Sequence, residues 1–380
     1  MKKKSILIVT GARSDYGLLR PIMREILKSK ELELRVLVTG MHTLKAFGST
    51  MDLVRADNMP IASIVPVSES GSMTDALAEE IKGIGRYCST HRPDIILIVG
   101  DRDESFAGAI VAGHLGITVA HIHGGDKTGS VGDEYIRHAT TKFSHIHFPA
   151  TKNSARRIKL LGEEPWRVLT TGGPGLDELR TSTFRTKESL AEQYKLSLDK
   201  PWHIVLQHPA PLDPARYEDQ IRPLLETLAA MPSEKIVLYP NADTGSDTFV
   251  REIEKLRKHS GMHVYRNIPR ADLVSMLTYA EFLIGNSSMG IIDCSFLGIP
   301  AVNVGNRQVM RERGVNVIDC EYDRRSIERA LVRARIPAFR YRAARGTSPY
   351  GDGHASERIV RGIKKLLSRK DLLNKKLTYK

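Results

Sequence analysis

The chain of 380 residues has few cysteines, and this scarcity limits what can hold it together. Cys88, Cys294 and Cys320 are the three cysteines, and they are widely separated along the sequence. So few and so scattered thiols form neither a disulfide framework nor a paired-cysteine metal clip. We therefore expect a protein of the reducing cytoplasm.

Long hydrophobic runs are also missing. The longest, such as IILIV at 95–99, are the length of a strand, whereas a bilayer-spanning helix needs roughly 20 apolar residues. The apolar stretch after the basic start, MKKKSILIVTGARSDYG, is too short for a signal peptide and is predicted to be a first strand. We expect no membrane association.

Acidic residues are fewer than basic ones, with 44 against 57, which gives a net charge of +13. This excess favours anionic partners, either nucleic acid or phosphorylated small molecules. No RNA- or DNA-binding signature accompanies the charge, so we expect no nucleic-acid partner. With 41% hydrophobic and 27% charged residues, the composition is that of a globular protein, and the length predicts two domains.

Short β-branched runs alternate with helical patterns throughout, which predicts parallel sheets with crossover helices. The first set of predicted strands covers 5–10, 34–39, 94–100, 117–123 and 145–148, and the second covers 202–208, 235–240, 281–286 and 299–305. We therefore expect an α/β protein with two doubly wound, Rossmann-like domains, 1–175 and 176–354, and a C-terminal helix at about 355–380 that packs back on the first. In such folds ligands bind at the carboxyl ends of the strands, so a cleft between the domains is the expected active site.

Polar residues follow the first predicted strand. TGARSDYG at 10–17 is a glycine turn that carries Arg13 and Asp15 before a helix. Such a turn can hold a phosphate or sugar oxygen on its backbone N–H groups. The alternative is a purely structural turn in which Asp15 caps the helix.

Acidic residues follow two later strands. In GDRDES at 100–105, Asp101 lies where a strand stops and a helix begins, so it is either an N-cap, which this stretch alone favours, or a general acid or base. In DEYIRH at 133–138, Asp133 and Arg137 lie one helical turn apart, a spacing that permits an ordinary intrahelical pair.

The sequence HIHGGD at 121–126 raises the question of a metal site. His121 and His123 occupy alternate positions, so both can point to the same face of a strand. Zinc would need further ligands, and His114, Asp126, Asp133 and His138 are near in sequence, but no HExxH motif or cysteine pair is present. We therefore predict no metal.

The second half repeats the pattern at its strand ends. His208 follows one strand, and Asn241 and Asp243 follow the next. GNSSMGIIDCSFLGIPAVNVGNRQ at 285–308 combines a serine- and glycine-rich turn, a helix start at about Met289 and Arg307 after the following strand. Free N–H groups, hydroxyls and a helix dipole suit a diphosphate, and Asp293 suits a ribose diol. The alternative is a polar loop capped by Asn286 or Ser287.

The order of these motifs resembles the hydrolysing UDP-N-acetylglucosamine 2-epimerases over residues 5–320. The resemblance rests on TGARSDYG, GDRDES, HIHGGD, DEYIRH, QHP, PNADTG, GNSSMGII and GIPAVNVGNRQ. It implies a GT-B-like fold and a reaction in which UDP is eliminated after loss of the proton on carbon 2. Water then adds to the 2-acetamidoglucal, and N-acetylmannosamine for sialic-acid-type sugars is released. The resemblance also implies no cofactor, UDP as product and a homodimer or homotetramer.

The resemblance assigns roles to individual residues. It implies that Asp101 and Asp133 are the acid and base carboxylates and that His208 faces the diphosphate and sugar. Two positions depart from the usual pattern: His123 stands where some members carry a catalytic glutamate, and Asp293 stands where glutamate is usual. We expect His123 to act directly or to orient a carboxylate. The implied substrate-binding set is Arg13, Asp15, Arg102, Asn241, Asp243, Ser287, Ser288, Gly290, Asp293 and Arg307.

Other functions fit the same sequence features. One is a hydrolysing epimerase of a UDP- or GDP-2,4-diacetamido-trideoxy sugar of the legionaminic acid pathway. A GT-B glycosyltransferase shares the fold, but acceptor binding does not need the carboxylates of the first domain. A non-hydrolysing epimerase would leave UDP attached to its product, and a nucleotide-sugar sensor or nucleic-acid-binding protein would not turn the sugar over at all.

Overall fold

The chain forms two compact units, each built around one parallel sheet. A computed structural model describes residues 3–44, 50–69, 72–128, 131–241 and 244–378. Unit 1 comprises Met1–Arg180 and Tyr350–Lys380, and unit 2 comprises Thr181–Pro349. The expected boundary after residue 175 thus falls just inside a helix, and residues 350–354 belong with unit 1.

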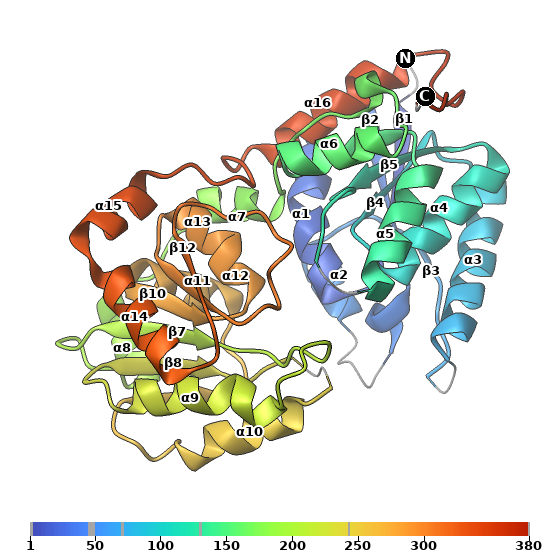
Figure 1. Cartoon of the computed structure of the whole chain (residues 1–380). Coiled ribbons are helices and arrows are strands. Elements are labelled where there is room, and N and C mark those ends of the chain that lie inside the picture. The colour runs from blue at the N-terminus through green and yellow to red at the C-terminus, as the bar shows by residue number, and fades with distance from the viewer. Residues whose placement is uncertain (1–2, 45–49, 70–71, 129–130, 242–243, 379–380) are drawn as a thin grey trace. The chain divides into compact units, whose positions relative to one another are not determined.

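Unit 1 contains a six-stranded sheet in the order β3-β2-β1-β4-β5-β6 (Figure 1). Its strands are β1 (Lys4–Thr10), β2 (Leu32–Val38), β3 (Ile61–Ile64), β4 (Ile95–Val99), β5 (Thr118–Ile122) and β6 (Ile146–Phe148). Its helices are α1 (Arg13–Leu27), η1 (Gly40–Thr43), α2 (Met51–Ala56), α3 (Met73–Thr90), α4 (Asp103–Leu115), α5 (Val131–Phe143), α6 (Lys152–Leu160), η3 (Pro165–Arg167), α7 (Gly175–Thr181) and α16 (Ala355–Leu367).

Unit 2 repeats this topology, with its sheet in the order β12-β11-β10-β7-β8-β9. Its strands are β7 (Trp202–Leu206), β8 (Glu234–Leu238), β9 (Met262–Tyr265), β10 (Ala280–Gly285), β11 (Ala301–Val304) and β12 (Val317–Cys320). Its helices are α8 (Lys187–Tyr194), α9 (Tyr217–Ala229), α10 (Ser246–Lys255), α11 (Arg270–Tyr279), α12 (Ser288–Ile291), α13 (Asp293–Leu297), α14 (Arg324–Arg335) and α15 (Pro337–Arg345). In each sheet the strand order reverses beside the first strand, between β1 and β4 in unit 1 and between β7 and β10 in unit 2. Ligands of doubly wound folds bind at the point where the strand order reverses.

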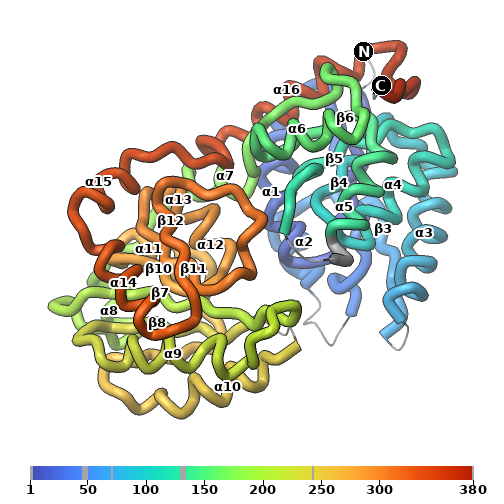
Figure 2. The backbone as a smooth tube through the Cα atoms, in the orientation of Figure 1, coloured from blue at the N-terminus to red at the C-terminus, as the bar shows by residue number. Residues whose placement is uncertain are grey.

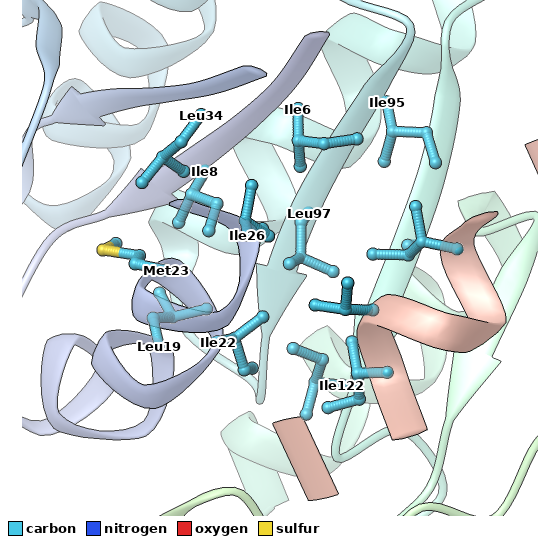
Figure 3. Packing of buried hydrophobic residues seen from close by; sticks show 14 of the residues in the cluster. Ile6, Ile8, Leu19, Ile22, Met23, Ile26, Leu34, Ile95, Leu97 and Ile122 are labelled. Carbon is cyan, nitrogen blue, oxygen red and sulfur yellow. The ribbon is translucent and has the colours of Figure 1, made fainter. Parts of the chain in front are cut away.

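Helices cover both faces of each sheet, because alternate residues of a strand point to opposite sides. In unit 1, Ile6 and Ile8 of β1 pack with α1 and α16, whereas Leu7 and Val9 pack with α3 and α4. Figure 3 shows Leu19, Ile22, Met23 and Ile26 of α1 against Ile6, Ile8 and Leu97 of the sheet. The apolar runs of the strands therefore reflect burial on two faces.

The C-terminal helix α16 is part of the unit 1 core. Ile359 and Ile363 are completely buried in the same cluster as Ile6 of β1, near the other end of the sequence. Figure 2 follows the chain back from unit 2 to this helix. Among the described residues, no helix is both long enough and apolar enough to cross a bilayer.

Candidate active site

The turn after β1 is held by the side chain of Asp15. Its carboxylate accepts hydrogen bonds from the N–H groups of Gly11 (2.9 Å) and Ala12 (2.7 Å). Burial, followed by the charge of Glu104, raises its pKa to about 6. Because both oxygens bind the turn itself, Asp15 has the structural capping role that was the alternative for this motif. Arg13 lies exposed at the first position of α1.

Arg102 lies directly before α4 and forms an ion pair with a buried carboxylate. Its Nη2 lies 2.9 Å from Oε1 of Glu104, a residue that is only 4% exposed. The Glu104 side chain fills the space beside Gly11, where a Cβ atom would come within 2.0 Å of Oε1. A glycine at position 11 is thus required for packing against this carboxylate.

Asp101 forms an ion pair with Arg137 of α5. The N-cap of α4 is Arg102, so the prediction that Asp101 caps this helix is wrong. Arg137 is buried and also donates from Nη1 to the carbonyl oxygen of His123 (3.3 Å). It therefore links the residues that follow β4 and β5. The side chain of Asp133 lies outside the described residues, so its role stays a prediction.

The two histidines of HIHGGD have different environments. His121 is completely buried in β5, and its ring contacts the carbonyl oxygen of Gly100 (2.7 Å) and Oγ1 of Thr141 (3.3 Å). Burial lowers its pKa to about 3, so it is a neutral structural residue at neutral pH. His123 follows the strand with φ +61°, and its Nδ1 lies 2.9 Å from Oδ2 of Asp126. The left-handed backbone at His123 ends the alternation of the strand.

Two of the nearby metal-ligand candidates, His114 and His138, contact groups of their own helices. The His114 ring contacts the carbonyl oxygen of Ile110 in its own helix, and His138 contacts Glu134. Across the part of the chain that the structure describes, no group of three or more His, Cys, Asp or Glu side chains is arranged to hold a metal ion.

In unit 2, His208 follows β7 and is locked in one tautomer. The N–H of Asn241 donates to its Nδ1 (3.1 Å), so the neutral ring carries its proton on Nε2. Burial, followed by the charge of Arg307, lowers its pKa to about 4. His208 is therefore a neutral hydrogen-bond donor at pH 7. Asp243 lies outside the described residues.

Asn286, which follows β10, organises this strand end. Its side chain accepts from the N–H of His208 (2.7 Å) and donates to the His208 carbonyl oxygen (2.8 Å). Its own carbonyl oxygen accepts from Arg307 Nη1 (3.3 Å) and Gln308 Nε2 (2.9 Å). Asn286 thus holds two of the predicted site residues. The sequence offered it only as a possible cap, because its partners are remote along the chain.

The serine-rich turn contains both capping and packing residues. Ser287 is the N-cap of α12, which begins at Ser288, and its Oγ accepts from the N–H of Met289 (3.3 Å). A Cβ atom at Gly290 would come within 3.1 Å of Leu283 and 3.3 Å of Ala301, so this glycine lets α12 lie close to the sheet. Its N–H donates to the Ser287 carbonyl oxygen (3.1 Å).

Asp293 begins α13 after a break at Ile292. It is buried, and one of its oxygens accepts from Arg270 Nη2 (2.6 Å). Burial raises the pKa of this carboxyl, although Arg270 opposes the shift. Sequence reasoning did not identify Arg270, because it lies on a different helix 23 residues away.

A known protein family matches most of the chain. The family described as UDP-N-acetylglucosamine 2-epimerase matches residues 24–364. The chain belongs to the UDP-N-acetylglucosamine 2-epimerase family. A member from Legionella pneumophila, UDP-N,N′-diacetylbacillosamine 2-epimerase (hydrolyzing), is 34% identical over 99% of this chain and 100% of its own length. A member from Neisseria meningitidis, UDP-N-acetylglucosamine 2-epimerase, is 32% identical over 87% of each chain.

Solved structures of the epimerase family share the fold. The crystal structure of a Neisseria meningitidis UDP-GlcNAc 2-epimerase bound to UDP-GlcNAc has a TM-score of 0.83. It is 18% identical and covers 95% of this chain and 100% of its own. The predicted GT-B-like class of two Rossmann-like sheets is confirmed.

Proposed function

We propose that this family member is a hydrolysing 2-epimerase of a UDP-sugar with an acetamido group at carbon 2. The observation that carries the proposal is the group formed by Asp101, Arg137 and His123 after β4 and β5 of unit 1. Proton transfer needs ionisable groups held at defined positions, and a buried arginine that joins both strand ends meets this need. The name of the Legionella relative includes the hydrolysing reaction.

The reaction proceeds in two steps. A base removes the proton on carbon 2, the C1–C2 double bond forms, and the C1–O bond breaks so that UDP leaves. Water then adds across the double bond. The hydroxyl binds to carbon 1, and carbon 2 receives a proton on the face opposite to the one from which the first proton was removed. Asp101 and Asp133 are the proposed acid and base carboxylates. Each such group typically raises the reaction rate by a factor of about 10² to 10⁴.

The strand ends of unit 2 bind the UDP moiety in this proposal. His208 donates from Nε2 to a diphosphate oxygen, and Arg307 supplies positive charge that stabilises the diphosphate as it leaves. Ser287 and Ser288 offer hydroxyls and N–H groups at the start of α12, and the second oxygen of Asp293 accepts from the ribose. Arg13 and Asn241 remain proposed substrate contacts. Asp15, Arg102 and Gly290 shape the turns that carry these contacts.

Two sugars are candidates for the substrate. The first is UDP-N-acetylglucosamine, which would yield N-acetylmannosamine. The second is UDP-N,N′-diacetylbacillosamine, and it is favoured by the relative that matches over its full length. Both carry the acetamido group and the carbon 2 proton on which the proposed chemistry depends, so the ratio of their kcat/KM values decides between them.

An NMR time course in D₂O with each sugar nucleotide tests the proposal. Hydrolytic epimerisation predicts one UDP released per free sugar, with deuterium at carbon 2 of the product. Protium retained at carbon 2 would overturn proton abstraction, and UDP still attached to the product would overturn the hydrolytic step. If neither sugar reacts until an acceptor is added, the protein is a glycosyltransferase.

A further inference from the structure

His123 has a backbone conformation that most residues avoid. Its φ of +61° is left-handed, and only two other non-glycine residues in the described part of the chain have a positive φ. Its N–H donates to the carbonyl oxygen of Phe148 (3.2 Å), and its own carbonyl accepts from Arg137 (3.3 Å). Strained backbone that its surroundings hold in place is frequent at functional sites, so the orientation of this ring needs an explanation.

The ring nitrogen Nδ1 of His123 contacts the carboxylate of Asp126, and a serine binds the other oxygen of that carboxylate. Nδ1 is 2.9 Å from Oδ2 of Asp126, and Oδ1 of Asp126 accepts from Oγ of Ser154 (2.7 Å). Ser154 lies in the first turn of α6 and is 1% exposed. Arg157 of the same helix donates to Oγ of Ser154 (3.1 Å). Positive charge and a helix N-terminus both favour an ionised Asp126.

An ionised carboxylate only accepts hydrogen bonds, so the proton of the neutral imidazole is on Nδ1 and the lone pair is on Nε2. Nε2 is buried and has no hydrogen-bond partner among the described residues. The residue beside it is Gly173, where a Cβ atom would lie 3.4 Å from Cε1 and 3.7 Å from Nε2 of His123. A buried ring nitrogen without a partner costs free energy unless a ligand uses it.

We propose that Asp126 is a positioning residue that makes Nε2 of His123 the basic nitrogen of the epimerase, an inference that rests on the proposed function. In the elimination step, the carbon 2 proton moves to Nε2. The electron pair of the broken C–H bond forms the C1–C2 double bond, and UDP leaves with the electron pair of the C1–O bond. The proton then passes from Nε2 to solvent. Asp101 and Asp133 then act as acid and base in the hydration step: one accepts a proton from the water that adds its hydroxyl to carbon 1, and the other donates a proton to carbon 2. Asp126 stays ionised and stabilises the imidazolium, as in other carboxylate-histidine pairs.

The charged groups around the ring determine the expected pH dependence. Asp126 faces Nδ1, Arg157 acts through Ser154, and Arg137 contacts the backbone and pairs with Asp101. His121 is neutral above about pH 3. Of these, Asp126 is the one in direct contact with the imidazole, so removing its charge makes the ring harder to protonate. The acid limb of the kcat/KM profile should then move to lower pH.

The test is Asp126→Asn in the full-length protein. We expect kcat to fall by a factor of about 10² or more, since the amide neither selects the Nδ1–H tautomer nor balances the imidazolium charge. KM should stay within about threefold, and the acid limb should shift to lower pH. Asp126→Glu restores the carboxylate and should recover part of the lost kcat. The acid limb of its kcat/KM profile should lie at the same pH as in the wild type. Unchanged turnover in Asp126→Asn would overturn the proposal.

A matched control uses a second histidine-carboxylate pair of unit 1. His354 Nδ1 lies 3.2 Å from Glu357 Oε1, with the same three-residue spacing. Glu357→Gln therefore makes the same chemical change outside the proposed site and should leave kcat and its pH profile unchanged. An equal loss of activity in this control would mean that the Asp126→Asn effect is not specific.

The tautomer itself is measured without any turnover. Long-range ¹H–¹⁵N spectra of the histidine-labelled protein should show His123, assigned by its absence from His123→Gln, with Nδ1 protonated. Asp126→Asn should alter that pattern. An Nε2–H tautomer in the wild type overturns the inference even if both sugars are substrates. If neither sugar reacts, the proposed function fails, and the spectra still decide whether Asp126 sets the tautomer.

Discussion

At the scale of single residues, buried charges in unit 1 are balanced by specific partners. The pair formed by Asp101 and Arg137 comes from two elements, and Arg137 is only 3% exposed. Removing one member of a buried ion pair leaves the other charge uncompensated, which costs more than the loss of one hydrogen bond. Substitutions here therefore affect both chemistry and stability, and the two effects need separate measurements.

Asp101→Asn should lower kcat by a factor of about 10² to 10⁴, because the amide neither donates nor accepts a proton in the reaction. The measurement is UDP release from saturating sugar nucleotide, accompanied by urea unfolding to account for lost stability. Asp52→Asn, which alters an exposed surface pair with Arg55, is the control and should not change turnover. A kcat within threefold of the wild type would remove Asp101 from the acid-base set.

Glu80 is a buried acid whose ionisation opposes folding. It is 2% exposed, and burial, followed by the charge of Glu104, raises its pKa from 4.5 to about 8. The folded state then binds the proton more tightly than the unfolded state, so this group lowers stability as pH rises from about 4.5 to 8. Glu80→Gln should be more stable than the wild type at pH 8 by at least about 1 kcal/mol.

Urea unfolding of both proteins at pH 5, 6.5 and 8 measures this effect. The difference between them should grow with pH, because glutamine does not ionise and still accepts from Thr39, which lies 3.3 Å from Oε1 in the wild type. A constant difference across the three pH values would contradict the raised pKa of Glu80.

Asn286→Ala should destabilise unit 2 and weaken UDP binding together. The substitution removes the two side-chain bonds to the His208 backbone, and each buried group left without a partner costs about 1–3 kcal/mol. Urea unfolding and calorimetric titration with UDP measure the two effects. Thr278→Ala, which removes one helix hydrogen bond of α11, should leave UDP affinity unchanged. Wild-type UDP affinity in Asn286→Ala would show that His208 does not depend on this side chain.

At the scale of elements, burial explains which strands could be predicted. The nine strands expected from the sequence are all present, and β3, β9 and β12 were missed. Each missed strand lies at the edge of its sheet. Each has four residues, of which at most one is buried. An edge strand keeps polar side chains, so it lacks the continuous apolar run by which central parallel strands are recognised.

Helix α16 contributes to the core of unit 1 from the far end of the chain. Ile363→Ala should lower the free energy of unfolding by about 2–5 kcal/mol, because Ile363 is fully buried and its removal leaves a cavity. Lys365→Ala, on the exposed face of the same helix, is the control and should change stability by less than about 0.5 kcal/mol. Urea unfolding measures both. Equal effects would mean that α16 is not part of the folding core.

At the scale of the whole molecule, the proposed function assigns UDP to unit 2. A ligand that binds only the folded state stabilises it, by about 2.7 kcal/mol at 100 times the dissociation constant. UDP should therefore raise the Tm of the full chain, and Arg307→Ala should reduce the shift at equal UDP concentration. Differential scanning calorimetry measures both. An identical shift in the variant would mean that Arg307 makes no contact with UDP.

The sequence alone determined the fold class and the strand ends that carry polar residues, because burial on two faces and glycine turns leave local patterns. It also determined the family through the order of those motifs. Only the tertiary structure decided what each side chain contacts. Asp15 binds N–H groups of its own turn, and Arg137 pairs with Asp101. Asn286 binds the backbone of His208, and Asp126 lies between His123 and Ser154. These partners lie on different elements, and long-range contacts are set by packing, which no local pattern records.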